Sequence, residues 1–516
     1  MRSTFMGLEA SKRGLFTQQS ALYTTGHNIS NANTIGYSRQ RVNMEATLGY
    51  PGTGLTAPKT PGYIGTGVQA QSVQRIRDSF IDTQFRQETN KLGYWESRSS
   101  AIAQVEDILN EPSDYGLAKS LNEFWKSLQD LSVNPENGGA RAVVVQRGIA
   151  VADSFNYMDS SISQIKENSG KEIGISLKDV NSILEQLANL NDQIKSVEPN
   201  GYMPNDLYDA RDNLLDQLST YLPIEIDKVP NGGNALAIAE GTINVSMKLK
   251  DGTTVKLVDG TDFVQLRNAG NSSTDKVTPT SAVTGFYTVS VDASGAETRI
   301  DDIDINSLSD LGKLKSLVNS YGYIAADGTE KGMYVDIMAK IDLLAKSFAE
   351  EFNKLHGEGT DLQGAAGQAF FDTAQPISAK TIAVSQAIID NPNLLAASSS
   401  APGEAEVGNG KQAMNLANMK SKGLTGLGDI SAQTYFEGLI GQLGVDGQQA
   451  IRLAFNSQTL QQAVSERKAS VSSVSLDEEM TNMITFQQAY NANARMITVI
   501  DETLDKIING MGRVGL

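Results

Sequence analysis

The side chains best suited to acid–base catalysis or metal binding at neutral pH are scarce in this chain. His27 and His356 are the only two histidines among 516 residues, and there is no cysteine. The two histidines are far apart in the sequence, and neither lies in an HExxH motif of the kind that binds zinc. We therefore expect no metal site, no Cys–His nucleophile and no catalytic residue.

Two short patterns imitate ligand-binding motifs. Residues 65–70, GTGVQA, match a GxGxxA dinucleotide fingerprint, but no apolar strand precedes them. Asp302, Asp304 and Asn306 occupy the first positions of a calcium loop, but Lys313 stands where a bidentate glutamate belongs. The first pattern is predicted to be a loop or an extended strand, the second is rejected as a calcium site, and no cofactor is expected.

Carboxylates cluster in the segment SLDEEM, residues 475–480. Such groups can act as general acids or bases. Ser475 stands three residues before Glu478, however, a spacing at which a hydroxyl and a carboxylate cap the start of a helix reciprocally. We interpret Glu478 and Glu479 as capping and solvated charges, and we expect no enzyme activity.

The composition argues against proteins that bind nucleic acid or span a membrane. A net charge of −17 and a pI near 4.7 argue against general binding to nucleic acid or to an anionic membrane, since like charges repel. No apolar run is long enough to span a bilayer, and the first residues lack the apolar core of a signal peptide. The absence of cysteine is compatible with a reducing cytosol or with a chain that travels unfolded.

Both ends of the chain have helical periodicity. Met1, Leu8, Leu15, Leu22 and Ile29 recur every seven residues, which predicts a helix with one apolar face. Residues 1–50 carry a net charge of +3 and residues 476–516 a net charge of −3, which favours association of the two ends. The C-terminal apolar positions step by three and four and comprise Met483, Phe486, Tyr490, Ala494, Met496 or Ile497, Ile500, Leu504, Ile507 and Met511.

Between the ends the periodicity changes from helical to strand-like and back. Residues 243–249 alternate apolar and polar side chains, and Asp251-Gly252 offers a two-residue turn into Val255 and Leu257, which predicts a hairpin. We predict a multidomain, mainly α protein with a β-rich inserted outer domain, a long helical bundle domain and paired, coiled-coil-like terminal helices. The predicted divisions are 1–72 with 471–516 (terminal domain), 73–222 with 303–356 and 431–470 (helical domain), 224–302 (β-rich domain) and 360–430 (mixed, of uncertain assignment).

The segment HNISNANTIGYSRQ, residues 27–40, places Asn28, Asn31 and Asn33 directly after the N-terminal periodic region. Asparagine amides satisfy backbone groups where a helix ends and tolerate left-handed conformations. The three amides are therefore expected to stop the helix and shape a turn closed by Gly36, whose backbone is left-handed or packed against a neighbouring chain. The same amides could instead bond to neighbouring subunits.

Residues 7–42, including Asn28, Asn31, Ala32, Asn33, Thr34, Gly36 and Tyr37, closely resemble the N-terminal signature of bacterial flagellar axial proteins. Residues 470–508, SVSSVSLDEEMTNMITFQQAYNANARMITVIDETLDKII, are similar to the C-terminus of the FlgK (hook-associated protein 1) family. The internal segments NDLYDARDNLLDQLS and LLAKSFAEEFNKLHGEGTDLQG also resemble that family.

The resemblance implies a structural protein of the extracellular bacterial flagellum, secreted by the flagellar type III apparatus, at the junction between hook and filament. It implies partners: copies of itself in a ring, hook protein, a second hook-associated junction protein, and an export chaperone on the C-terminal helix. It implies no cofactor, no nucleic acid and no membrane insertion, and both termini pair as helices in an inner tube. Two alternatives stay open: another axial protein of hook or rod type, and a secreted enzyme with flagellar-type ends and an active site within residues 224–430.

The periodicity and the resemblance together predict which residues form the assembly interface. These are Leu8, Leu15, Leu22, Ile29, Asn28, Asn31, Asn33, Gly36, Tyr37, Met483, Phe486, Tyr490, Ile497, Ile500, Leu504 and Ile507.

Overall fold

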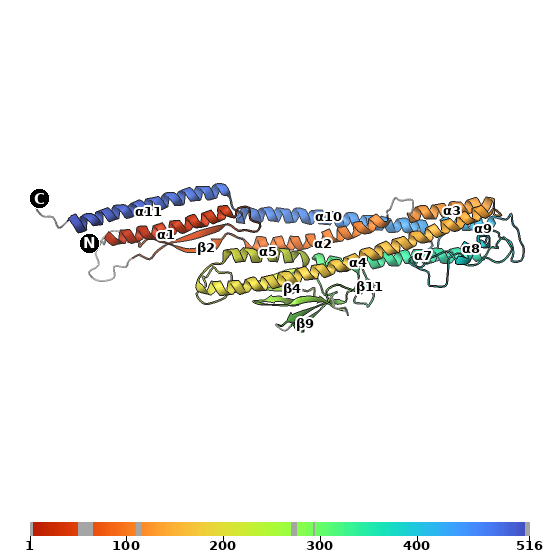
Figure 1. Cartoon of the computed structure of the whole chain (residues 1–516), viewed down its shortest axis with the longest axis horizontal. Helices are drawn as coiled ribbons and strands as arrows, with labels where there is room; N and C mark the ends of the chain where they lie inside the picture. Colours follow the sequence, from red (N-terminus) through yellow and green to blue (C-terminus); the bar gives the residue numbers. More distant parts are fainter. Residues whose placement is uncertain (1–3, 50–64, 110–115, 270–275, 293–294, 511–516) are drawn as a thin grey trace.

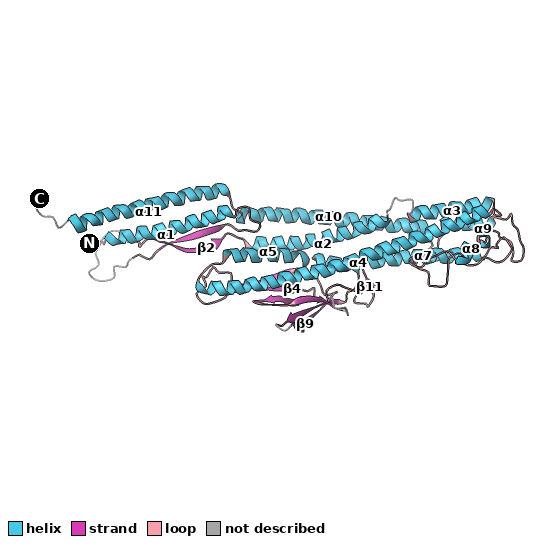
Figure 2. Cartoon of the chain, viewed as in Figure 1, coloured by secondary structure: helices cyan, strands magenta, loops and turns pink. Residues whose placement is uncertain are grey.

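A computed structural model describes residues 4–49, 65–109, 116–269, 276–292 and 295–510. The molecule is elongated, with long helices along its length and the strands to one side (Figures 1 and 2). It is mainly α with small sheets, as the periodicity predicts. Met1 and Met511, the outermost residues of the two predicted apolar patterns, lie outside the described residues.

The two ends of the chain form an antiparallel helix pair at one end of the molecule (Figure 1). Helix α1 spans Thr4–Ser30 and α11 spans Leu476–Gly510, and small residues of α1 face α11. A Cβ atom on Gly7 would lie 3.3 Å from Ile500, and one on Gly14 would lie 2.9 Å from Asn493. We call this unit the terminal pair.

A two-stranded hairpin packs against α1. Its strands are β1 (Gln40–Ala46) and β2 (Val68–Arg75), which pair antiparallel with Val42 opposite Val73. Strand β2 includes the end of the GTGVQA segment, so the predicted extended conformation is confirmed there. The hydroxyl of Thr17 on α1 donates to the Val68 carbonyl at 3.2 Å.

The helical body extends from the terminal pair to the far end of the molecule (Figure 1). Helix α10 begins where the Ser431 hydroxyl accepts a hydrogen bond from the Thr434 N–H, and its C-terminal end leads into α11. The helices of the body are α2 (Ser79–Leu109), α3 (Leu117–Val133), α4 (Gly138–Val197), α5 (Asn205–Tyr221), α6 (Lys313–Tyr321), α7 (Met333–Gly357), α8 (Gln386–Asp390), α9 (Lys411–Asn418) and α10 (Ala432–Ser472).

The described strands of the inserted region form two antiparallel sheets of order β3-β4-β5-β6 and β7-β8-β9. The predicted hairpin is confirmed, since β4 pairs with β5 and Met247 lies opposite Val255. The strands are β3 (Ile224–Val229), β4 (Thr242–Lys248), β5 (Thr254–Asp259), β6 (Asp262–Phe263), β7 (Gln265–Asn268), β8 (Gly285–Val291) and β9 (Glu297–Asp304); β10 (Tyr323–Ile324) and β11 (Glu330–Lys331) form a separate ribbon.

The inserted region leaves and rejoins the helical body at one place. The backbone of Gly312 has φ +88°, and a Cβ atom there would lie 2.3 Å from the Tyr221 carbonyl oxygen. The end of α5 and the start of α6 are therefore in contact, and the chain from 222 to 311 begins and ends at this contact.

Among the described residues, two hydrophobic cores hold the body, and the 60-residue helix α4 contributes to both. The first core gathers aromatic rings of Phe124, Phe348 and Phe352. Phe370 and Phe371 also belong to it, so the segment of uncertain assignment, 360–430, packs into this helical core. The second core lies between the C-terminal half of α4, α5, α6 and the sheets.

Candidate functional site

The amide-rich segment is organised around the buried side chain of Asn28, in the last turn of α1. Its Oδ1 accepts hydrogen bonds from the Tyr37 hydroxyl (2.8 Å) and the Gln40 N–H (3.0 Å). Its Nδ2 donates to the Gln40 carbonyl (2.8 Å) and to Glu479 Oε2 (3.0 Å). An asparagine amide offers two donors and two acceptor positions, so all of them are used within this chain.

The turn after α1 has the shape that the sequence predicts. Nδ2 of Asn31 donates to the His27 carbonyl at 3.1 Å, and the Tyr37 N–H donates to the Thr34 carbonyl at 3.2 Å. The left-handed backbone predicted for Gly36 is confirmed, with φ +81°. The group packed against Gly36 belongs to the same chain, because a Cβ atom there would lie 1.9 Å from the Asn213 side chain of α5.

Arg39 connects the turn to the start of α11. Its Nη1 lies 2.6 Å from Glu478 Oε2 and its Nε lies 2.8 Å from Glu479 Oε1. The Arg39 N–H donates to the Ser472 carbonyl at 2.8 Å, just before the break between α10 and α11. The prediction that Glu479 is a solvated charge is wrong: its side chain is 3% exposed, because Arg39 and Asn28 replace water around it.

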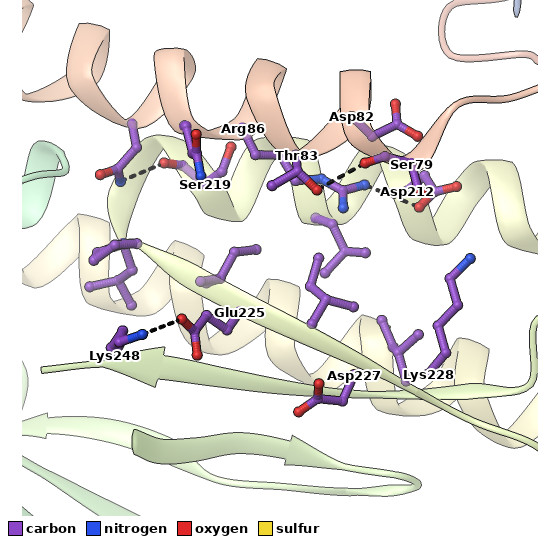
Figure 3. A pocket seen from close by; sticks show the side chains of 18 of the residues that line it. Ser79, Asp82, Thr83, Arg86, Asp212, Ser219, Glu225, Asp227, Lys228 and Lys248 are labelled. Atoms are coloured by element: carbon purple, nitrogen blue, oxygen red, sulfur yellow. Dashed lines mark hydrogen bonds and ion pairs between the residues drawn. The ribbon is translucent and has the colours of Figure 1, made fainter. Parts of the chain in front are cut away.

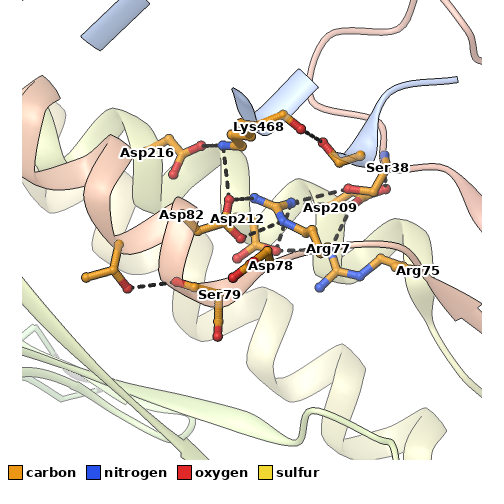
Figure 4. Close-up of polar contacts among 12 residues, drawn as sticks. Ser38, Arg75, Arg77, Asp78, Ser79, Asp82, Asp209, Asp212, Asp216 and Lys468 are labelled. Carbon is orange, nitrogen blue, oxygen red and sulfur yellow. Dashed lines mark hydrogen bonds and ion pairs between the residues drawn. The ribbon is translucent and has the colours of Figure 1, made fainter. Parts of the chain in front are cut away.

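A second cluster joins the hairpin to the helical body, and we call it the charged joint (Figure 4). Arg75 and Arg77 come at the end of β2 and directly after it, while Asp209, Asp212 and Asp216 lie three and four residues apart on α5. The charged joint comprises Arg75, Arg77, Arg86, Asp82, Asp209, Asp212, Asp216 and Lys468.

Each guanidinium in the charged joint binds two or more carboxylates. Arg75 Nη1 lies 2.6 Å from Asp209 and 3.0 Å from Asp212. Arg77 makes two hydrogen bonds to Asp82, of 2.8 and 3.0 Å, and a third contact of 3.0 Å to Asp212. Lys468 brings in α10, with its Nζ 2.6 Å from Asp216. The hairpin, α2, α5 and α10 therefore meet through charges.

Burial and ion pairing shift the pKa values of Asp212 and Asp82 in opposite directions. Burial alone raises the pKa of Asp212, but Arg77, Arg75 and Arg86 outweigh it and hold that pKa well below its ordinary value. The pKa of Asp82 is also lowered, because its hydrogen bonds from Arg77 outweigh burial. Asp212 and Asp82 therefore stay ionised, and the ion pairs of the charged joint hold the four elements together.

The predicted interface residues divide into three groups. Asn28, Asn31, Gly36 and Tyr37 make the intrachain contacts described above, and Asn33 is exposed. A second group is half-buried along the terminal pair: Leu8, Leu15, Leu22, Ile29, Phe486, Tyr490, Ile497, Ile500 and Leu504. Met483 and Ile507 are exposed.

A further apolar surface was not predicted. Phe16 and Tyr23 on α1 are 56% and 81% exposed, and together with Phe5 they lie on one face of the helix, away from α11 and the hairpin. On α11, Ile484, Met496 and Val499 are more than half exposed. The sequence did carry a signal for this face, because Phe16 follows Phe5 by 11 residues and Tyr23 follows Phe16 by 7. The leucine heptad beside it is more regular and was used instead. We call these residues the open apolar surface.

The described residues contain no group of three or more His, Asp or Glu side chains placed to hold a metal ion. His356 is fully buried, accepts a hydrogen bond from the Ala396 N–H at 2.8 Å, and has a pKa lowered to about 4 by burial. Within the described ranges, no helix combines the length and apolar character needed to cross a bilayer.

Comparison with known proteins shows the family. Residues 102–371 match the flagellar hook-associated protein FlgK helical domain, and residues 469–510 match the C-terminal domain of flagellar basal body rod FlgEFG proteins. The chain is 43% identical over 520 residues to flagellar hook-associated protein 1 of Bacillus subtilis, covering 99% of each. The chain belongs to the FlgK family. It is also 26% identical to flagellar hook-associated protein 1 of Escherichia coli, covering 96% of this chain and 98% of that one.

The fold agrees with this assignment. The structure of the flagellar hook junction protein FlgK from Burkholderia pseudomallei superposes with a TM-score of 0.58 at 13% identity, covering 76% of this chain and all of that chain. FlgK-family membership makes this chain a structural component of the extracellular flagellum. The charged joint and the amide turn are therefore parts of a structural subunit.

Proposed function

We propose that this chain forms the junction between hook and filament, and that its terminal pair packs with the terminal pairs of other copies in an inner tube. The partners in this proposal are further copies of the chain, hook protein and a second hook-associated junction protein. The proposal includes export of the chain by the flagellar type III apparatus, an export chaperone on α11, and no enzyme activity.

The observation that carries the proposal is the open apolar surface. A helix with apolar residues around its whole circumference is normally buried. Helix α11 is half-buried on one side against α1, yet it exposes Ile484, Met496 and Val499 on other sides. Large exposed apolar side chains that recur on one helix face, as Phe5, Phe16 and Tyr23 do on α1, mark contacts with other molecules. Packing with neighbouring copies would remove them from water.

The amide turn and the charged joint support the same proposal from inside the subunit. Both are made entirely of contacts within one chain, and they connect the terminal pair to α5 and α10. A terminal pair held in this way presents its open apolar surface in one orientation relative to the body. Repeated assembly with one geometry requires that orientation to be the same in every copy.

The experiment replaces Phe16 and Tyr23 by Asp in a strain whose own copy of the gene is deleted. These side chains are exposed in the subunit, so the F16D/Y23D chain should fold, with its melting temperature within a few degrees of the unchanged chain. Burying the new carboxylates between copies is strongly unfavourable. The variant should be secreted but absent from isolated hooks, and the cells should lack filaments.

Tyr157→Asp on α4 is the matched control, since this aromatic side chain is 53% exposed on the helical body. Cells carrying it should keep their filaments. Normal hook occupancy by the F16D/Y23D chain would contradict packing of the terminal pair. A deletion strain with complete filaments would contradict the junction role itself.

A further inference from the structure

Strand β3 has an unpaired edge. It is the first strand of the sheet β3-β4-β5-β6, and within the described residues it has a strand partner, β4, on one side only. An edge strand presents backbone N–H and C=O groups that can pair with another strand. The side chains of Glu225, Asp227 and Lys228 on β3 are exposed.

The unpaired edge borders a cleft of about 870 Å³ that α2 and α5 close on the other side (Figure 3). Leu215, Ile224 and Ile226 give it apolar walls, and Lys228 and Lys248 stand at its rim with side chains 50% and 56% exposed. Eight Lys and Arg residues line the cleft against five Asp and Glu residues, although the whole chain has a net charge of −17. An acidic strand with apolar side chains would complement it.

The same chain carries such a strand. Strand β9 is the last strand of the sheet β7-β8-β9 and pairs with β8 alone among the described strands. Its sequence, ETRIDDID, has four carboxylates against one arginine, and Ile300 is 52% exposed. Asp301 and Asp302 are also exposed.

We propose that β9 of a second copy of this chain adds to the unpaired edge of β3, with Ile300 toward the cleft and the four carboxylates of β9 spread along an edge that has Lys228 near one end and Lys248 near the other. Backbone pairing supplies affinity in strand addition, and side-chain pockets supply specificity. Lys248 now pairs with the exposed Glu225, and exposed pairs exchange at little cost. Lys228 pairs with Glu240, which is 22% exposed and keeps Arg75 and Arg211 as partners when Lys228 turns away. The contact joins different surfaces of two copies, so it can repeat around a ring; in this respect it rests on the proposed function.

The first test uses the soluble full-length chain and a labelled synthetic peptide of residues 297–305. Fluorescence anisotropy should show saturable binding, weakened about tenfold in the K228E/K248E chain. A peptide with Lys in place of Asp301 and Asp302 should bind the K228E/K248E chain more tightly than it binds the unchanged chain. If K228E/K248E unfolds, K228S/K248S replaces it. Absence of saturable binding, or equal binding to both chains, would overturn the proposal.

The second test uses engineered cysteines in assembled flagella, because the natural chain contains no cysteine. A chain with K228C and I300C should form disulfide-linked multimers on mild oxidation, and each single variant should form none. Multimers from K228C alone would show that two clefts face each other, which contradicts the proposal. Absence of the chain from flagella would instead contradict the junction role, whereas its presence without cross-links contradicts only the β3–β9 contact.

Discussion

The Asn28 amide and the Glu479 carboxylate lie 451 residues apart in the chain, yet Nδ2 and Oε2 are 3.0 Å apart in the structure. Asn28 lies in the last turn of α1 and Glu479 in the first turn of α11, so this hydrogen bond joins the two helices at the end nearest the body. Arg39 and Gln40 complete its surroundings. The turn that follows α1 is therefore the place where both terminal helices are attached to the body.

Replacing Asn28 by Ala should loosen this attachment. The variant leaves the Gln40 backbone groups and the Tyr37 hydroxyl without their partner, at a cost of roughly 1 to 3 kcal/mol. Hydrogen exchange by mass spectrometry should show faster exchange in α1 and β1 and no change in α4. Asn33→Ala is the control, because Asn33 is exposed, and it should exchange like the unchanged chain.

Gly36→Ala should destabilise the turn in the isolated subunit. A left-handed backbone costs a residue with a Cβ atom about 1 to 2 kcal/mol, and here that atom also meets Asn213. The double variant G36A/N213A removes the clash and keeps the backbone strain. In hydrogen exchange, the double variant should recover part of the protection that the amides of the turn lose in G36A. Full recovery would show that the strained backbone contributes nothing.

Arg77→Ala should be more damaging than either change in the turn. It leaves Asp82 and Asp212 buried with fewer positive charges, and breaking a buried ion pair costs about 3 to 5 kcal/mol. We expect a lower melting temperature and loss of protection where β2 meets α5. Arg299→Ala, which removes an exposed pair with Asp302, should change the melting temperature little.

His356 should make the body sensitive to mild acid. Burial lowers its pKa in the folded chain to about 4, below its ordinary value of 6.5, so the unfolded chain binds the extra proton first. The stability that this group contributes is complete above pH 6.5 and is lost as the pH falls. Between pH 6.5 and 5 the loss should be roughly 1.5 kcal/mol. Urea unfolding at both pH values should show it, and His356→Gln should reduce the difference.

The terminal pair should exchange amide hydrogens faster than the body in the isolated subunit. Within the described residues, Ala21 is the one fully buried apolar side chain of α1, and α11 has none, whereas α4 contributes to two cores. Helices with few buried contacts open readily. Equal protection of α11 and α4 would contradict this prediction, and so would a large drop in melting temperature for Leu504→Asp.

Local patterns in the sequence predicted the local elements well. The leucine heptad predicted α1, the alternation from Ile243 to Leu249 predicted β4, and Gly36 marked a left-handed turn. In each case the signal and the structure lie within a few residues of each other. Periodicity and turn chemistry act at that range.

The charged joint and the ion pair between Arg39 and Glu479 were not predicted, because the partners are distant in sequence. Arg75 and Asp209 are 134 residues apart, and Arg39 and Glu479 are 440 apart. A solvated arginine and a buried one look alike in a single sequence. The three aspartates of α5, spaced by three and four, could only suggest a charged helix face, which is usually solvated.

The contact between Tyr221 and Gly312 has a genetic consequence. Because residues 222–311 leave and return at one point, a gene could lose, lengthen or exchange this stretch without moving α5 relative to α6. Mutation and recombination can therefore alter residues 222–311 independently of the terminal pair and the charged joint. The chains of related bacteria should differ most in this stretch, both in its length and in its sequence.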